Sequence, residues 1–201
     1  MRLTLNITGV DALRERLKEF PKALARAERN AANTTATAVK AAGIEEVFKM
    51  FHVDKKARLK KDSRGRDTVF IRRAREGEAA AVVTFKRGAS AKSGDLLGLQ
   101  HFKTDTTDAN VKEKGWRPHI QLKRNGQIKK VAGGFYGMGR LKGLGIFERR
   151  GRKLTRRTGL SLHMMVKQPE VLKNVLQIGR SLFAKLLEMT IEKQIAKIKQ
   201  R

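Results

Sequence analysis

Two dense runs of basic residues are the groups in this sequence most suited to a specific interaction. The first run contains Lys55, Lys56, Arg58, Lys60 and Lys61, and the second contains Arg149, Arg150, Arg152, Lys153, Arg156 and Arg157. Cations at this density attract polyanions, because each one that neutralises a phosphate releases a condensed counterion. We expect these side chains to contact DNA or an acidic partner protein through electrostatic positioning alone. A solvated cationic face is the alternative for either run.

The whole chain shares this basic character. It has 201 residues with 46 Lys and Arg against 19 Asp and Glu, which is a formal net charge of +27. Most of the excess lies in residues 51–160, which carry 29 of the basic and 10 of the acidic residues. Nucleic acid, an acidic protein surface and anionic lipid are the natural neighbours of such a chain. Lipid fits least, since the basic stretches lack the apolar face of an interfacial helix and the chain has only one Trp, one Tyr and nine Phe.

Catalytic and metal-binding groups form no recognisable pattern. The lack of Cys excludes disulfides, thiolate zinc sites and Cys nucleophiles. The His residues are scattered without metal-ligand spacing, and the acids of one polar loop lack strand-borne partners for Mg²⁺. These residues are His52, His101, His119 and His163, and Asp95, Asp105, Asp108 and Glu113. The glycine-rich segment Gly133–Gly145, expected to be a loop, lacks the Gly-Lys-Ser/Thr ending of a P-loop. We therefore expect no enzyme activity, no metal and no cofactor.

Three helices are predicted from apolar spacing. Thr8-Gly-Val-Asp11 has the spacing of a capping box and predicts a helix from about Val10 to Phe20, which Pro21 interrupts. A second helix, from Lys22 to about Phe51, has a face made mostly of alanine. A third runs from Pro169 to about Lys199 with two adjoining apolar stripes, so we expect a wide buried face against the Ala-rich helix, with another copy of the chain as a further neighbour. The first stripe is Val171, Val175, Ile178, Leu182, Leu186 and Met189, and the second is Leu172, Leu176, Phe183, Leu187 and Ile191.

The middle of the chain contains β-rich runs. They are Thr68–Arg72, Ala79–Lys86, Leu96–Phe102, His119–Arg124 and Gln127–Val131. The first two are predicted to form a hairpin. The last two flank Asn125-Gly126, which predicts a hairpin with a type I′ turn in which Ile120, Leu122 and Ile128 face the core. The basic run 55–61 is predicted to form one or two helical turns with Asp54 as the N-cap.

These elements predict an α+β fold, in which Ala-rich N-terminal helices and a long C-terminal helix pack on one face of a four- to five-stranded, mainly antiparallel sheet. We expect a single domain over residues 1–201, with N-terminal helices in 1–51, a basic β region in 52–160 and the C-terminal helix in 161–201. No run approaches the about 18 apolar residues that a membrane-spanning helix needs, and Met1–Thr8 lacks the apolar core of a signal peptide. We therefore expect a protein of the cytoplasm, or of a particle assembled there, without a membrane partner.

Four segments occur in an order that is typical of one protein family. They are Gly9-Val-Asp-Ala-Leu13 before an Ala-rich helix ending near Phe51, Val53-Asp-Lys-Lys-Ala-Arg-Leu-Lys60, Gly134-Phe135 leading to Gly145-Ile-Phe-Glu-Arg-Arg150, and His163-Met-Met-Val-Lys-Gln-Pro-Glu-Val-Leu172. In this order and spacing the chain resembles the minor tail protein Z family of long-tailed bacteriophages, also described as tail completion proteins. It departs from the family pattern after Arg150, where Lys153-Leu-Thr-Arg-Arg157 replaces a Leu-Pro-Ile-like step.

The resemblance implies a structural virion component at the junction of tail and head, without enzymatic activity. It implies a homo-oligomeric ring, a hexamer, that meets the tail tube or tail terminator and the head-tail connector, with genomic DNA in its channel. Such a protein caps the head-proximal end of the tail and promotes head-tail joining. It is found in the virion and, during assembly, in the host cytoplasm.

A non-specific nucleic-acid-binding or DNA-packaging protein is the alternative function. Such a protein binds tightly as a free monomer, with an affinity that falls steeply as salt rises, whereas a ring component binds weakly until it is assembled. A sequence-specific reader is not expected, because the chain shows no helix-turn-helix pattern with a basic second helix, no zinc finger and no paired aromatics of an RNA-binding sheet. A metal-dependent nuclease is a third option, but no residues point to it.

Overall fold

The chain divides into two compact units. The computed structural model describes residues 2–3, 15, 21–61, 65–75, 80–86, 96–104, 117–138 and 144–199. Unit 1 consists of Met1–Gly43, Val69–Phe85 and Lys167–Arg201, and unit 2 consists of Ile44–Thr68 and Lys86–Val166. The helix predicted from Val10 to Phe20 lies, apart from Glu15, outside the described residues. The expectation of a single domain stays a prediction.

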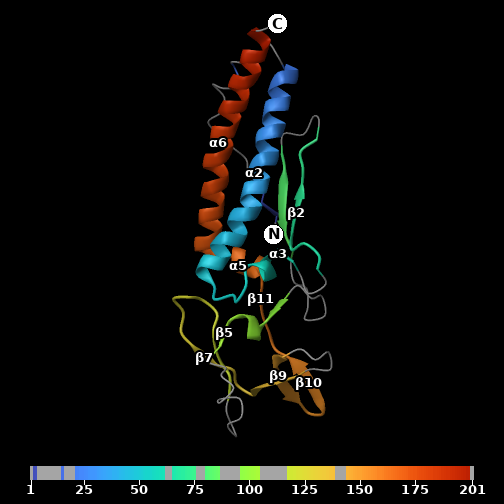
Figure 1. Ribbon diagram of the computed structural model, residues 1–201, viewed down its shortest axis with the longest axis vertical. Coiled ribbons are helices and arrows are strands. Elements are labelled where there is room, and N and C mark those ends of the chain that lie inside the picture. The colour runs from blue at the N-terminus through green and yellow to red at the C-terminus, as the bar shows by residue number, and fades with distance from the viewer. Residues whose placement is uncertain are drawn as a thin grey trace. The chain divides into compact units, whose positions relative to one another are not determined.

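Two long helices pack together in unit 1 (Figure 1). The helix α2 spans Pro21–Met50, of which the part before residue 44 belongs to this unit, and α6 spans Pro169–Lys199. Ala27 and Ala31 of α2 form a buried cluster with Leu187 and Ile191 of α6. Alanine at the contact lets two helix backbones approach closely. Both predicted helices are confirmed, and each starts at a proline, which needs no hydrogen-bond partner for a backbone amide there.

A small antiparallel sheet completes unit 1. Its strands are β1 (Arg2–Leu3), β2 (Val69–Arg72) and β3 (Val82–Phe85), in the order β1-β3-β2. The predicted hairpin is confirmed, since Val69 pairs with Phe85 and the register continues to Arg72 and Val82. Asn33 of α2 ties the helix to the chain after β2, because its side-chain amide accepts from the Ala74 amide at 2.8 Å and donates to the Ala74 carbonyl at 3.3 Å.

In its described residues, unit 2 contains the end of α2, two short helices and three small antiparallel sheets. The helices are α3 (Ala57–Lys60) and α5 (Leu162–Val166), with a 3₁₀ turn, η2, at Leu99–His101. The strands are β4 (Leu96–Gly98), β5 (Lys103–Thr104), β6 (His119–Gln121), β7 (Lys129–Lys130), β8 (Gly134–Met138), β9 (Leu144–Arg150), β10 (Lys153–Arg156) and β11 (Thr158–Ser161). The sheet orders are β5-β6-β7, β10-β9-β8 and β11-β4. Leu99, Ile120, Val131 and Ile146 form a buried cluster that joins these sheets.

The α+β class is confirmed, with two long helices and antiparallel strands. The strands differ from the prediction in their arrangement, since they form four small sheets rather than one sheet of four or five strands. The reason is strand length. Strands such as β5 and β7 have two residues each, too few to extend a ladder into a larger sheet.

The turn between β6 and β7 also differs from its prediction. The Gly126 amide donates to the Lys123 carbonyl at 3.1 Å, so Arg124 and Asn125 are the central residues and Gly126 is the last. The side-chain amide of Gln121 donates to the Arg124 and Gly126 carbonyls at 3.0 and 2.8 Å, which stabilises this turn in place of the type I′ turn. Ile120 is buried as predicted, but Ile128 is 61% exposed because the connection is longer than two residues.

The glycine-rich segment is largely a β-ladder and not a loop. Gly134–Met138 and Leu144–Arg150 pair as β8 and β9, and residues 139–143 between them lie outside the described residues. Glycines in this segment allow neighbouring parts of the chain to approach closely. A Cβ on Gly134 would lie 2.7 Å from Cγ1 of Val131, and Gly137 pairs directly with Gly145. The prediction failed because a high glycine content marks close backbone packing as well as loops.

Candidate nucleic-acid interface

The first predicted basic run lies on and around α3, and most of its cations have acidic partners. Lys56 forms an ion pair with Glu45, Nε of Arg58 lies 2.9 Å from Oδ2 of Asp54, and Nζ of Lys61 lies 3.5 Å from Oδ1 of Asp67. Lys55 and Lys60 are exposed, and no described carboxylate forms an ion pair with either. This run therefore offers fewer uncompensated cations than its sequence indicates.

Backbone and core contacts hold α3 in place. Leu59 is buried, and Thr68 donates from its amide to the Lys60 carbonyl at 3.0 Å and from its hydroxyl to the same carbonyl at 3.1 Å. The predicted N-cap was wrong. Lys56 occupies that position, whereas Asp54 accepts from the Lys55 amide at 2.7 Å and pairs with Arg58. Asp54 therefore organises the entry to the helix from two positions before the N-cap.

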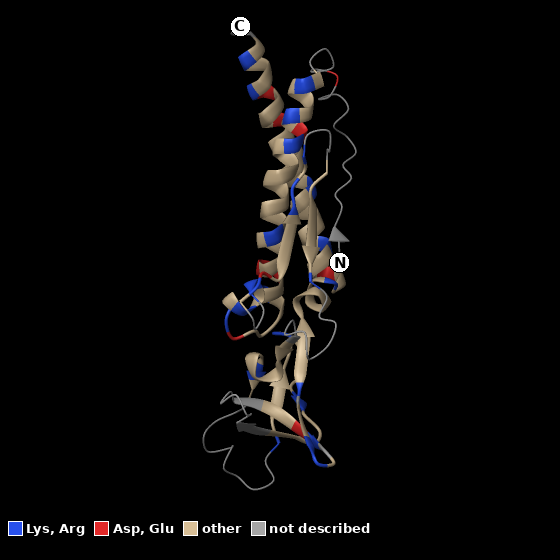
Figure 2. Ribbon diagram, turned by 90° about the vertical axis from the view of Figure 1, so that its right-hand side faces the viewer, with Lys and Arg blue, Asp and Glu red and all other residues tan. Residues whose placement is uncertain are grey.

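The second predicted run forms the hairpin of β9 and β10 (Figure 2). Arg150 pairs with Lys153 across a two-residue turn of Gly151 and Arg152, in which Gly151 has a φ of 58°. Arg149, Arg152 and Lys153 are exposed, and the carboxylates that the structure describes form no ion pair with them. The hairpin therefore presents cations that are available to an external anion. The side chains of Arg150 and Arg156 lie outside the described part of the structure.

The base of this hairpin carries a different pattern. Nε of Arg157 lies 2.9 Å from Oε2 of Glu148, so Arg157 is neutralised within the unit. Phe135 of β8 pairs with Phe147 of β9, and their ring centroids are 6.4 Å apart. Arg149 lies two residues beyond Phe147 on the same face, opposite the exposed Leu154. The sequence alone did not indicate this aromatic pair, because the strand register creates it.

A third group of cations, which are not among the predicted contact residues, lies on the sheet β5-β6-β7 and its turns. Residues 96–104 and 117–135 contain no Asp or Glu. Their Lys and Arg side chains are all exposed, namely Lys103, Arg117, Lys123, Arg124, Lys129 and Lys130. We call this the acid-free sheet. A count of acids in each predicted hairpin would have found it, whereas the search for dense basic runs passed over these spaced cations.

Hydrogen bonds through η2 connect these groups within unit 2. The Asp54 amide donates to the His101 carbonyl at 2.8 Å, and the Leu99 amide donates to the Arg157 carbonyl at 3.4 Å. The segment 96–104 therefore links the entry to α3 with the chain that follows β10. This shared framework holds the segments that carry the exposed cations within one unit.

Two histidines lie within this framework. Nδ1 of His101 is 3.5 Å from Oδ2 of Asp54. Burial lowers the pKa of His52 below its usual 6.5, and the positive charges of Arg124 and Lys103 lower it further. In the part of the chain that the structure describes, no group of three His, Asp or Glu residues is arranged to hold a metal ion.

No described helix combines the length and the hydropathy needed to span a bilayer. The chain matches no protein-family model, no curated protein and no solved structure.

Proposed function

We propose that this chain is a structural protein of a phage tail that caps the head-proximal end of the tail and promotes its joining to the head. The observation that carries the proposal is the concentration of exposed cations in unit 2, on the β9–β10 hairpin and the acid-free sheet, beside the resemblance to tail completion proteins. A ring around a DNA channel needs a surface that tolerates phosphates of any sequence. Cations with no base-reading module provide such a surface.

Self-association into a ring is part of the proposal, and α6 is its proposed surface. The buried apolar side chains in the first half of α6 are Val171 and Val175, which belong to the first stripe. Those in the second half are Leu187 and Ile191, which belong to the second stripe. Two other members of the first stripe, Ile178 and Met189, are 37% and 43% exposed. A second copy of the chain would cover them, as the resemblance to ring-forming tail proteins implies.

Electron microscopy of phage lysates tests the joining role. Lysates of a phage from which this gene has been deleted should contain filled heads and full-length tails that are not joined. The wild-type gene supplied from a plasmid should restore joined virions. Normal joined virions in the deletion lysate would refute the tail-completion role.

The same complementation experiment tests whether the cations of the β9–β10 hairpin are needed for joining. A plasmid copy with Arg149→Gln, Arg152→Gln and Lys153→Gln should fail to restore joining. A matched copy with Arg72→Gln, Arg73→Gln and Arg75→Gln, three exposed cations of unit 1, should restore it. If the hairpin variant restores joining as well as the matched copy does, the hairpin has no part in docking.

Non-specific nucleic-acid binding is the second candidate, and the acid-free sheet favours it. It predicts that the free monomer binds duplex DNA tightly at physiological salt, whereas the ring component binds weakly until assembly. Affinity measured with monomer and assembled protein at the same salt concentration distinguishes the two.

A further inference from the structure

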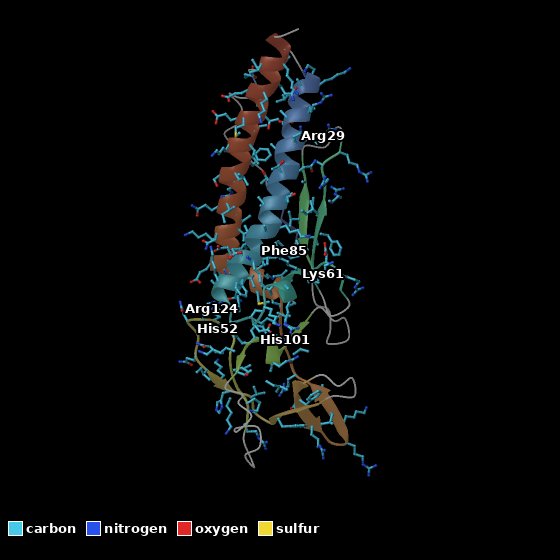
Figure 3. The ribbon with its side chains drawn as sticks, in the orientation of Figure 1. Arg29, His52, Lys61, Phe85, His101 and Arg124 are labelled. Carbon is cyan, nitrogen blue, oxygen red and sulfur yellow. The ribbon has the colours of Figure 1, made fainter. Side chains whose placement is uncertain are left out.

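Backbone pairing brings together three basic residues that are distant in sequence at the end of α2 in unit 2. His52 follows the helix, Lys103 belongs to β5 and Arg124 is in the turn after β6. The His52 amide donates to the Leu122 carbonyl at 2.9 Å, and the Arg124 amide donates to the Met50 carbonyl at 2.8 Å. Bridges of Phe51 with Lys123 and of Val53 with Phe102 extend this pairing on both sides. Figure 3 shows His52 and Arg124 side by side.

Arg124 is held firmly in this position. Its Nε donates to the Phe48 carbonyl at 3.2 Å, and its guanidinium carbon lies 5.5 Å from the centroid of the Phe48 ring. These contacts satisfy carbonyls at the end of α2 and leave the two terminal nitrogens of the guanidinium for other acceptors. Among the described residues, no carboxylate forms an ion pair with Arg124. The geometry is therefore that of a pre-positioned donor.

No carboxylate that the structure describes forms an ion pair with His52, Lys103 or Arg124. Asp54 is the nearest carboxylate along the sequence, and it is engaged with Arg58 at 2.9 Å and with His101 at 3.5 Å. Arg124 and Lys103 act on the pKa of His52 in the direction expected for like charges. The fold therefore places Arg124 and Lys103 where they disfavour the charged form of His52, and a bound anion would favour that form again.

We propose that His52, Lys103 and Arg124 form a site for a phosphate group of the duplex DNA backbone. Arg124 supplies paired donors in a fixed fork, Lys103 supplies a point charge, and His52 supplies an imidazole N–H. The exposed Lys129 and Lys130 on the same sheet provide further cations for the neighbouring phosphates of a repeating anion. This inference deepens the proposed function and rests on it for the choice of duplex DNA.

Proton uptake by His52 reports directly on the site. A phosphate beside the ring favours the imidazolium, so duplex binding should raise the pKa of His52 by about 1. By linkage, the affinity for duplex should rise as the pH falls through the range between the free and the bound pKa. Within the described residues, the charged groups that act on His52 are Arg124 from the turn after β6 and Lys103 from β5, in addition to its burial.

NMR titration of the His52 imidazole in the full chain, with and without a short DNA duplex, tests the site. We expect the duplex to raise the pKa of His52 in the wild type. The variant Lys103→Gln should bind the duplex about tenfold more weakly, and its salt slope should be smaller by roughly 0.9. Lys103→Gln is the main variant because, unlike Arg124→Gln, it removes no hydrogen bond at the helix end. Arg72→Gln, which removes one exposed charge from unit 1, should change neither quantity.

Two outcomes would overturn the site. In the first, the duplex binds but the pKa of His52 stays fixed and Lys103→Gln binds like the wild type. In the second, inorganic phosphate at the same phosphate concentration raises the pKa of His52 as much as the duplex does, which would show a general anion site. Neither outcome touches the joining role, since that role fails only if deletion lysates contain joined virions.

Discussion

The lowered pKa of His52 makes the stability of the folded protein depend on pH. The pKa of this residue is lowered in the folded protein, so the unfolded chain binds a proton more readily. Unfolding should therefore become easier as the pH falls below 6.5, the usual value, and this loss should be complete below the lowered pKa.

The variant His52→Asn tests this dependence. It removes the titration and should give a free energy of unfolding that changes less than the wild type's between about pH 8 and about pH 5. Urea unfolding at the two pH values measures the difference. Equal pH dependence in both proteins would contradict the lowered pKa.

Gly43 shows how a local preference yields to packing at the residue scale. Alanine is favoured over glycine inside a helix by about 1 kcal/mol. A Cβ at this position would, however, lie 2.6 Å from Cζ of the fully buried Phe85. We expect Gly43→Ala to destabilise unit 1 by about 1 to 2 kcal/mol, because the ring cannot move away.

A double-mutant cycle isolates this contact. Phe85→Leu removes the ring edge that the new methyl group would strike, so Gly43→Ala should cost less in the Phe85→Leu background by about 1 kcal/mol. Thermal unfolding of the four proteins gives the coupling. Additive effects would show that the loss has another cause.

The hairpin of β9 and β10 depends, at the element scale, on one backbone conformation. Gly151 has a φ of 58°, and open space surrounds the position of its missing Cβ, so only backbone strain opposes a side chain there. Gly151→Ala should cost about 1 kcal/mol, while Gly151→Asn should cost less because Asn tolerates the left-handed region. Amide hydrogen exchange of Glu148 and Thr155, which pair across the hairpin, measures the loss. Equal exchange in the Ala and Asn variants would contradict this cause.

Two apolar residues of α6 that are two positions apart, Leu187 and Met189, differ in exposure. Leu187 is fully buried against Ala27 and Ala31, whereas Met189 is 43% exposed. Leu187→Ala should lower the free energy of unfolding by about 2 to 5 kcal/mol. Met189→Asp should leave the monomer folded and instead prevent self-association, which analytical ultracentrifugation measures. Unchanged self-association would remove α6 from the proposed ring contact.

At the scale of the whole molecule, net charge and local charge make different predictions for DNA binding. The hairpin variant with Arg149, Arg152 and Lys153 changed to Gln and the matched variant with Arg72, Arg73 and Arg75 changed to Gln both lower the net charge from +27 to +24. If only net charge mattered, both would lose the same affinity.

We expect the hairpin variant alone to lose affinity for duplex DNA, with a salt slope smaller by roughly 0.9 for each phosphate contact removed. Fluorescence anisotropy across a range of salt concentrations measures both quantities. Equal losses in the two variants would mean that the long-range field of the chain, and not the hairpin, attracts DNA.

The sequence by itself determined the elements whose signal is local and repeated. The helices at Pro21–Met50 and Pro169–Lys199 follow from apolar spacing and an initial proline, and the β2–β3 hairpin follows from β-rich runs around a turn. Net charge and the lack of Cys are likewise properties of composition. Such signals are read over a few residues, and tertiary contacts did not override them here.

Only the tertiary structure decided which cations are available and which side chains meet. The dense run around α3 is largely neutralised because Glu45 and Asp67 fold back onto it, and spacing along the chain cannot reveal that. The approach of His52, Lys103 and Arg124 depends on backbone pairing between residues 49 to 74 positions apart, such as Val53 with Phe102 and Met50 with Arg124. Electrostatic interaction depends on distance in space, and that distance exists only in the folded chain.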